Sequence, residues 1–102
     1  MSNYQVKPKL GVIGGMGPEA TVLLMSRIID LTEASDDCDH IPMLVDNNTQ
    51  VPSRIKAIIE KTGDDPSNIL ITMAKALEGN GAKILAMPCN TAHYYASTIQ
   101  EA

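Results

Sequence analysis

One cysteine of this chain lies where an apolar run meets a segment with helical character. Cys89 stands in the segment from Met87 to His93 and is followed directly by Asn90 and Thr91. Backbone N–H groups and the helix dipole at the start of a helix stabilise an anion, which favours the reactive thiolate form of a cysteine. Asn90 and Thr91 can cap the helix or donate hydrogen bonds to a carboxylate at the same end. A free cysteine is more often a small buried apolar residue, but these neighbours favour a reactive thiol at Cys89.

The other cysteine and the two histidines carry less information. His93 lies one helical turn after Cys89, where it is as compatible with tuning the thiol as with an exposed helix position, and we do not predict a general base there. Cys38 lies in an acidic run, and acidic neighbours disfavour a thiolate, so we predict that it is a bystander. His40 is isolated from other ligand types, so no metal site is predicted.

Two further polar segments follow apolar runs. In the first, the residues from Gly15 to Ala20 fit the pattern G-x-G-x-x-[GA] of dinucleotide-binding proteins, and Asp46 could then contact a ribose. This pattern is weak when it stands alone, and a tight turn whose N–H groups face a small anion is the better interpretation. In the second, Arg54 offers a planar cation suited to a carboxylate, with Gln50 nearby as a neutral donor and acceptor. The alternative for Arg54 is an exposed arginine on a helix face.

The elements that must position these residues alternate along the chain. Apolar runs predict strands at 10–13, 41–45 and 82–87. Apolar spacing and start signals predict helices from 19 to about 34, from 52–54 to near 63, from 65–67 to the glycines at 79 and 81, and from 90 to 102. This alternation predicts a three-layer α/β/α fold with a parallel sheet. Ligands bind beyond the carboxyl ends of such strands, so the three polar segments should converge there.

The composition limits the class of protein. The chain has 102 residues, is 44% hydrophobic, lacks Trp and Phe, and carries a net charge of -4. These values predict one small α/β domain spanning residues 1–102, and they argue against nucleic-acid and membrane partners. The N-terminal residues lack the apolar region of a signal peptide, and the cysteines are better interpreted as thiols than as a disulfide. We therefore expect a cytoplasmic protein.

Three segments together resemble one known family. The sequence LGVIGGMGPEAT, from Leu10 to Thr21, is similar to the opening of aspartate racemases in the aspartate/glutamate racemase family. The segment from Asn47 to Arg54 resembles the second loop of that family, and the segment from Met87 to His93 resembles its first catalytic cysteine motif. The matches occur in the family's order and at compatible spacing, and together they outweigh the dinucleotide-binding alternative.

The resemblance implies a cofactor-independent racemase of an acidic amino acid, aspartate above all. Family members have two similar α/β domains, each contributing one cysteine to a site between them, and they use neither pyridoxal phosphate nor a metal. By this resemblance Cys89 is one catalytic thiol. Asn90 and Thr91 would hold the α-carboxylate, Arg54 the second carboxylate, and Met16 would line the cleft, with Gln50 also expected to contact substrate.

This sequence departs from the family in one large respect. The family's second cysteine, in a Gly-Cys-Thr type of motif, is absent from these residues, and Cys38 is not in such a motif. The chain is therefore expected to be the N-terminal, cysteine-bearing half of a two-domain racemase, inactive alone. Its expected partners are an amino-acid substrate and further copies of itself in a homo-oligomer. A non-catalytic module that binds a small ligand or a dinucleotide is the alternative.

Overall fold

The structure, a computed structural model, describes residues 7–61, 63–89 and 95–102. Its centre is a parallel sheet of three strands, β1 (Lys9–Gly14), β2 (Met43–Asn47) and β3 (Ala82–Ala86), in the order β2-β1-β3. Strand β1 pairs with β2 from Leu10 opposite Met43 to Gly14 opposite Asn47. As the central strand, β1 is buried over its last four residues, which matches its continuous apolar sequence.

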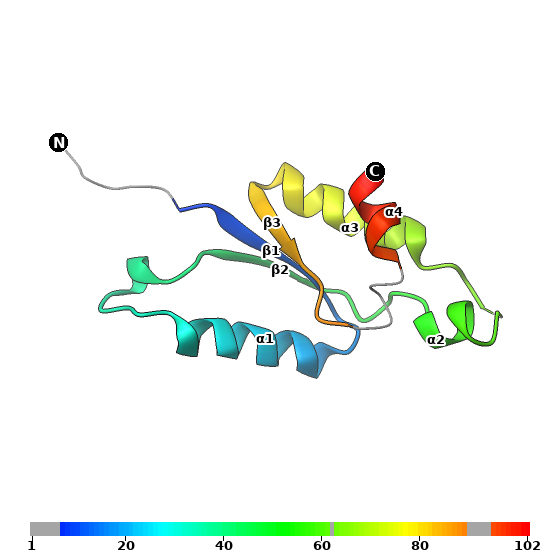
Figure 1. Ribbon diagram of the computed structural model, residues 1–102, viewed down its shortest axis with the longest axis horizontal. Coiled ribbons are helices and arrows are strands. Elements are labelled where there is room, and N and C mark those ends of the chain that lie inside the picture. Colours follow the sequence, from blue (N-terminus) through cyan, green and yellow to red (C-terminus); the bar gives the residue numbers. More distant parts are fainter. Residues whose placement is uncertain (1–6, 62, 90–94) are drawn as a thin grey trace.

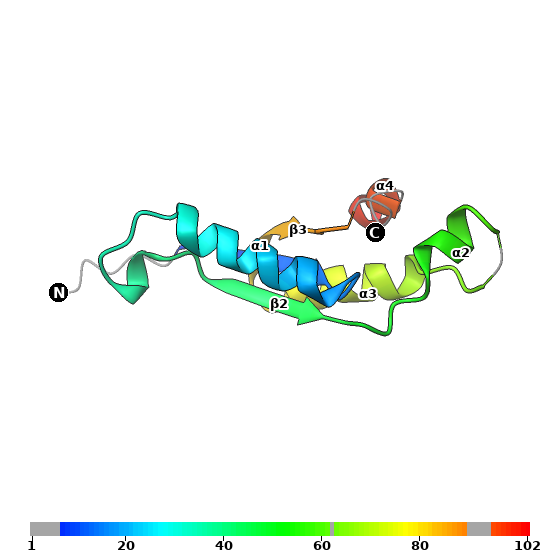
Figure 2. The same ribbon diagram turned by 90° about the horizontal axis from the view of Figure 1, so that it is seen from below.

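Helices cover both faces of this sheet. Helix α1 (Pro18–Leu31) follows β1, a 3-10 turn (Asp37–Asp39) precedes β2, and α2 (Arg54–Ile58) and α3 (Ser67–Gly79) lie between β2 and β3. Helix α4 (Ala96–Glu101) ends the chain. Figures 1 and 2 show α1 on one face of the sheet and α3 with α4 on the other. The predicted three-layer α/β/α fold with a parallel sheet is confirmed.

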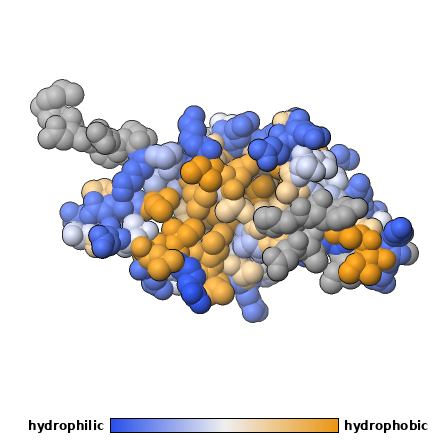
Figure 3. Space-filling view, in the orientation of Figure 1, coloured by the Kyte–Doolittle hydropathy of each residue, from blue (hydrophilic) through white to orange (hydrophobic). Residues whose placement is uncertain are grey.

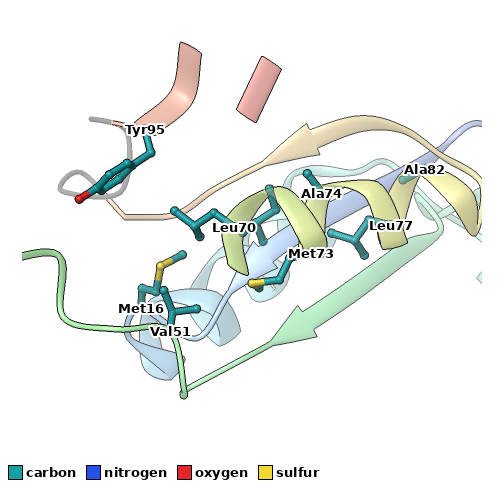
Figure 4. Close-up of a cluster of buried hydrophobic side chains, with 9 residues drawn as sticks. Met16, Val51, Leu70, Met73, Ala74, Leu77, Ala82 and Tyr95 are labelled. Atoms are coloured by element: carbon teal, nitrogen blue, oxygen red, sulfur yellow. The ribbon is translucent and has the colours of Figure 1, made fainter. Parts of the chain in front are cut away.

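The main core lies between α3 and the sheet. Leu70, Met73, Ala74 and Leu77 are buried along one side of α3, as their helical spacing requires. They form one cluster with residues from the strands, the loops and the start of α4, drawn in Figure 4: Ile13, Met16, Val51, Ala82 and Tyr95. The helix approaches closely because β1 has a glycine at position 11. A Cβ atom there would lie 2.7 Å from Cδ2 of Leu85 and 3.2 Å from Cβ of Leu77.

The opposite face is covered less completely. Of the residues of α1 only Thr21 is buried, whereas Val22 is 60% exposed and Leu23 is 56% exposed. Leu85 of β3 lies on the same side of the sheet as Leu77 of α3. Because successive side chains of a strand point to opposite faces, Ile84 points to the side of α1, and it is 61% exposed. Figure 3 shows apolar side chains gathered over α1 and β3. We give the name outer apolar face to the exposed Val22 and Leu23 of α1 and Ile84 of β3.

Several predicted boundaries are wrong by a few residues. Strand β2 lies two residues later than expected, because its register with β1 runs from Met43 to Asn47. Before the strand, the carbonyl oxygen of Pro42 accepts the N–H of Leu10 at 2.9 Å. Helix α1 ends at Leu31 rather than near 34, and α2 ends at Ile58 rather than near 63. The last predicted helix is described only as α4, since residues 90–94 lie outside the described ranges. No helix within the described ranges is long and apolar enough to cross a membrane.

Candidate functional site

The loops that follow β1 and β2 are joined at the carboxyl edge of the sheet. The N–H of Asn48 donates to the carbonyl oxygen of Gly14 at 3.1 Å, which continues the pairing of the two strands beyond their ends. Gly15 has a φ of 100°, and a Cβ atom on it would lie 2.2 Å from the backbone carbonyl of Asn48. Glycine is therefore required at position 15 by both its conformation and its neighbour.

The first of these loops is fastened by a residue that the sequence analysis missed. The N–H of Gly15 donates to Oγ1 of Thr21 at 3.0 Å, and this hydroxyl donates to the carbonyl oxygen of Gly17 at 3.4 Å. Thr21 is 1% exposed, and within the described ranges it is the one buried polar residue. The available signal was a threonine in the first turn of the helix after a Gly-Pro start, a position from which a hydroxyl reaches back to the loop.

Met16, predicted to line the cleft, lies at the junction of the loops. Its side chain is 5% exposed and belongs to the core cluster with Val51 of the second loop and Tyr95 before α4. Figure 4 shows Met16 and Val51 close together, with Tyr95 on the other side of the junction. Met16 is thus part of the core at the carboxyl edge of the sheet. Its contact with a substrate stays a prediction.

The second loop carries exposed and half-buried amides. The N–H of Gln50 donates to Oδ1 of Asn48 at 3.0 Å, forming a local turn around the asparagine. The side chain of Gln50 is exposed, and its Nε2 donates to Oγ1 of Thr49 at 3.2 Å. Nδ2 of Asn48 points inward and approaches the sulfur of Met73 at 3.7 Å. Asn48 therefore connects this loop to the core, while Gln50 is accessible to a ligand.

Arg54 is partly engaged by its own loop. Its Nη1 donates to the carbonyl oxygens of Val51 at 3.3 Å and Pro52 at 3.2 Å, and the side chain is half-buried. Its Nε is buried and has no hydrogen-bond partner among the described residues. A buried donor of a charged group without an acceptor is unfavourable, so this atom is suited to receive an oxygen from a ligand. Arg54 is thus both a support of the loop and a candidate carboxylate ligand.

The third loop carries the predicted catalytic thiol. Cys89 is half-buried and packs against the core cluster that contains Met16 and Val51. Its N–H donates to the carbonyl oxygen of Met87 at 2.8 Å, so the chain turns sharply just after β3. The predicted carboxylate ligands Asn90 and Thr91, like His93, lie outside the described residues. The structure therefore brings Cys89, Met16 and the second loop to one edge of the sheet.

Cys38 lies away from the candidate site, and the described residues form no cluster of metal ligands. Cys38 is exposed in the 3-10 turn before β2, at the opposite edge of the sheet from Cys89. Asp39 in the same turn has a lowered pKa because its carboxylate accepts hydrogen bonds from the backbone N–H groups of Ser35 and Asp36. Within the described ranges, no three His, Cys, Asp or Glu side chains are close enough to hold a metal ion.

A groove of about 460 Å³ lies next to this edge, between α3, β3 and α4. Met87 and Leu85 contribute to one wall, and Lys75, Glu78 and Ile99 contribute to the others. Among the described residues, none of those predicted to bind substrate (Met16, Gln50 and Arg54) lines this groove. The candidate site is therefore the loop edge, with a thiol that can exchange a proton and an arginine and amides that can bind carboxylate oxygens.

The chain is similar to known proteins over most of its length. The family described as Asp/Glu/Hydantoin racemase matches residues 13–102. The broad specificity amino-acid racemase RacX of Bacillus subtilis (strain 168) is 33% identical over 97 residues, covering 91% of this chain and 41% of that protein. The aspartate racemase of Picrophilus torridus superposes with a TM-score of 0.82 at 36% identity, covering 89% of this chain and 39% of that one.

A second solved structure is similar over the same part. An aspartate racemase homologue from Pyrococcus horikoshii OT3 superposes with a TM-score of 0.69 at 25% identity, covering 93% of this chain and 41% of that one. The chain thus spans about two fifths of the length of these relatives.

Proposed function

The chain belongs to the Asp/Glu/hydantoin racemase family, and on this basis we propose that it is the part of an amino-acid racemase that carries one catalytic thiol, Cys89. The observation that carries the proposal is the position of Cys89 at the carboxyl edge of a parallel sheet, packed against the same cluster as Met16 and Val51. Ligands of parallel α/β folds bind at this edge. Cys38, exposed at the opposite edge, has no such surroundings.

The proposed reaction inverts the α-carbon by moving protons on two faces. The thiolate of Cys89 removes the α-proton and becomes a thiol, and the electron pair of the broken C–H bond stays on the substrate as a carbanion. A second acid then protonates the opposite face. The resemblance implies a second cysteine in a Gly-Cys-Thr type of motif, and these residues do not contain that motif. The chain alone therefore supplies one face, and we expect it to be inactive as a racemase.

The proposed substrate is an acidic amino acid, aspartate above all. Nε of Arg54, buried without a hydrogen-bond partner in the described ranges, suits one oxygen of a second carboxylate. Gln50 is exposed in the same loop segment and is proposed as a further donor to the substrate. Asn90 and Thr91 are proposed for the α-carboxylate by the resemblance of their motif. Binding of both carboxylates would stabilise the developing negative charge without pyridoxal phosphate or a metal.

The dinucleotide-binding alternative is not favoured. One glycine of the pattern that suggested it, Gly15, is explained within the chain, because a Cβ atom there would meet the backbone of Asn48. We propose further that the chain self-associates through its outer apolar face, since monomers rarely expose a large continuous apolar patch. The cytoplasm is the proposed compartment, as expected for free thiols.

The first experiment tests Cys89 as a substrate-shielded thiol. The purified chain is treated with limiting iodoacetamide at neutral pH, with and without L-aspartate, and the alkylation rates of Cys89 and Cys38 are measured by mass spectrometry. We expect Cys89 to react faster and L-aspartate to slow Cys89 alone, with L-leucine as the control ligand. Faster reaction of Cys38, or protection of neither thiol, would contradict the proposal.

The second experiment tests the division of the two proton transfers. The chain is incubated with L-aspartate in D₂O, and α-deuterium and D-aspartate are measured separately. We expect slow incorporation of deuterium with retained configuration, abolished by Cys89→Ser, and negligible D-aspartate. Substantial D-aspartate at low protein concentration would show that one domain suffices. A rate that rises with the square of protein concentration would instead indicate that two copies pair to supply both thiols.

A further inference from the structure

The hydroxyl of Thr21 occupies an unusual position for a helix residue. It lies in the first turn of α1, accepts from the N–H of Gly15 at 3.0 Å and donates to the carbonyl oxygen of Gly17 at 3.4 Å. Both partners belong to the loop that follows β1, so one side chain spans the turn that contains Met16. The side chain is 1% exposed and its hydrogen bond with Gly15 is buried, so water is not available to replace that bond. The bond to Gly17 is only part-buried.

The rest of the loop also depends on this side chain. A Cβ atom on Gly14 would lie 2.5 Å from Oγ1 of Thr21, so the threonine fills the space beside the end of β1. On the other side, Gly14 accepts the N–H of Asn48, and Gly15 touches the backbone of Asn48. A shift of the turn would therefore be transmitted to the second loop, which carries Gln50 and Arg54.

We propose that Thr21 is a positioning residue for the substrate site, because its hydroxyl holds the turn between Gly15 and Gly17 and thereby sets the relative positions of the first two loops. The inference rests on the proposed function, since it assigns Thr21 a role in substrate binding at that site. Thr21 does not contact the substrate in this assignment. It acts through Gly15 and, beyond that, through Asn48.

The matched set of variants separates hydrogen bonding from packing. Thr21→Val keeps the shape and removes the hydroxyl, whereas Thr21→Ser keeps the hydroxyl and removes the methyl group. Thr32→Val is the control, because Oγ1 of Thr32 donates to the carbonyl oxygen of Ile28 at 2.6 Å, just beyond the far end of α1. Thermal unfolding of each variant identifies a temperature at which all of them are folded.

The first measurement is hydrogen exchange of the Gly15 amide by NMR. We expect exchange at least about tenfold faster in Thr21→Val, with wild-type protection in Thr21→Ser and Thr32→Val. The second measurement is the concentration of L-aspartate that half-protects Cys89 from iodoacetamide. We expect this concentration to rise roughly tenfold in Thr21→Val and to change less than about threefold in the other two variants.

The outcomes separate this inference from the proposed function. If L-aspartate does not protect Cys89 in the wild-type chain, the proposed function fails, and this inference fails with it. If the wild-type chain is protected and Thr21→Val is protected equally, the inference alone is overturned. If Thr21→Val does not fold, the Thr21→Ser variant decides. Suppose that its Gly15 amide exchanges as slowly as in the wild type but L-aspartate shields Cys89 less well from iodoacetamide. The hydroxyl would then be shown not to position the site.

Discussion

Two helices of nearly equal length cover the two faces of the sheet in different ways. Helix α3 has 13 residues and buries Leu70, Met73, Ala74 and Leu77. Helix α1 has 14 residues and buries only Thr21, although its sequence is also rich in Ile, Leu and Val. The first is held by apolar contacts along its length, and the second is fastened at its first turn by hydrogen bonds to the loop after β1. Apolar periodicity thus predicts a helix, but it does not say how much of that helix is buried.

The largest expected effect is the difference in core contribution between these helices. Leu70 is fully buried, so Leu70→Ala should lower the free energy of unfolding by about 2–5 kcal/mol. Leu23 is 56% exposed, and Leu23→Ala should lower it by less than about 1 kcal/mol. Urea denaturation of both variants provides the measurement. Equal losses would mean that α1 is covered as completely as α3 in solution.

The next effect concerns the loop to which α1 is fastened. Gly15→Ala places a Cβ against the backbone of Asn48 and imposes an unfavourable φ, so we expect a loss of about 1–3 kcal/mol of stability. Gly79→Ala is the control, because a Cβ at the end of α3 meets nothing within 4 Å. Denaturant titrations compare the two. A neutral Gly15→Ala would show that the two loops are separable.

A third effect distinguishes the outer apolar face from other exposed apolar residues. Leu23→Lys and Ile84→Lys add charge to this face and should reduce self-association without lowering the free energy of unfolding by more than about 1 kcal/mol. Ile59→Lys is the matched control, since Ile59 is 70% exposed and lies just after α2, away from the face. Sedimentation velocity over a range of concentrations measures the effect. A monomeric wild-type chain would refute the proposed self-association.

The smallest effect concerns how α3 begins. Asp65 accepts hydrogen bonds from the hydroxyl of Ser67 at 2.7 Å and from its N–H at 2.9 Å, which lower the pKa of this exposed carboxyl. A carboxyl with a lowered pKa in the folded state stabilises the fold above its unfolded pKa, about 3.9, and this contribution is lost as the pH falls through the folded pKa. The stability difference between wild type and Asp65→Asn should therefore shrink on acidification. Urea midpoints at several pH values test this, and a constant difference would contradict it.

Much of the architecture follows from the sequence because local signals agree with one another. Apolar runs that end in glycines or polar residues alternate with helical spacing, and only a parallel α/β sheet accommodates that alternation. The boundaries of β2 are less predictable. Asp46 and Asn47 have loop composition, but they pair with Ile13 and Gly14 because β2 follows the length of the central strand. Pairing between distant segments decides such ends, and local composition does not contain it.

The candidate site divides in the same way. Cys89 can be singled out as a candidate catalytic thiol from the sequence, because a cysteine between a predicted strand and a predicted helix is a local feature. The hydrogen bonds of Arg54 to its own loop depend on how that loop folds back, which no spacing rule reveals. For Thr21 the sequence shows a threonine shortly after a Gly-Pro helix start, but not that its hydroxyl accepts the N–H of Gly15. Only the structure shows that this hydroxyl faces the glycine turn.

The hydrogen bond from Asn48 to Gly14 has a thermodynamic consequence for any ligand of this edge. Fixing the backbone of one residue costs about 1–2 kcal/mol in conformational entropy. Because the first two loops are already ordered as an extension of the sheet, this entropy is lost during folding, before a ligand arrives. A ligand that docks against these two loops therefore meets a preorganised surface, and most of its contact energy with them can appear as affinity.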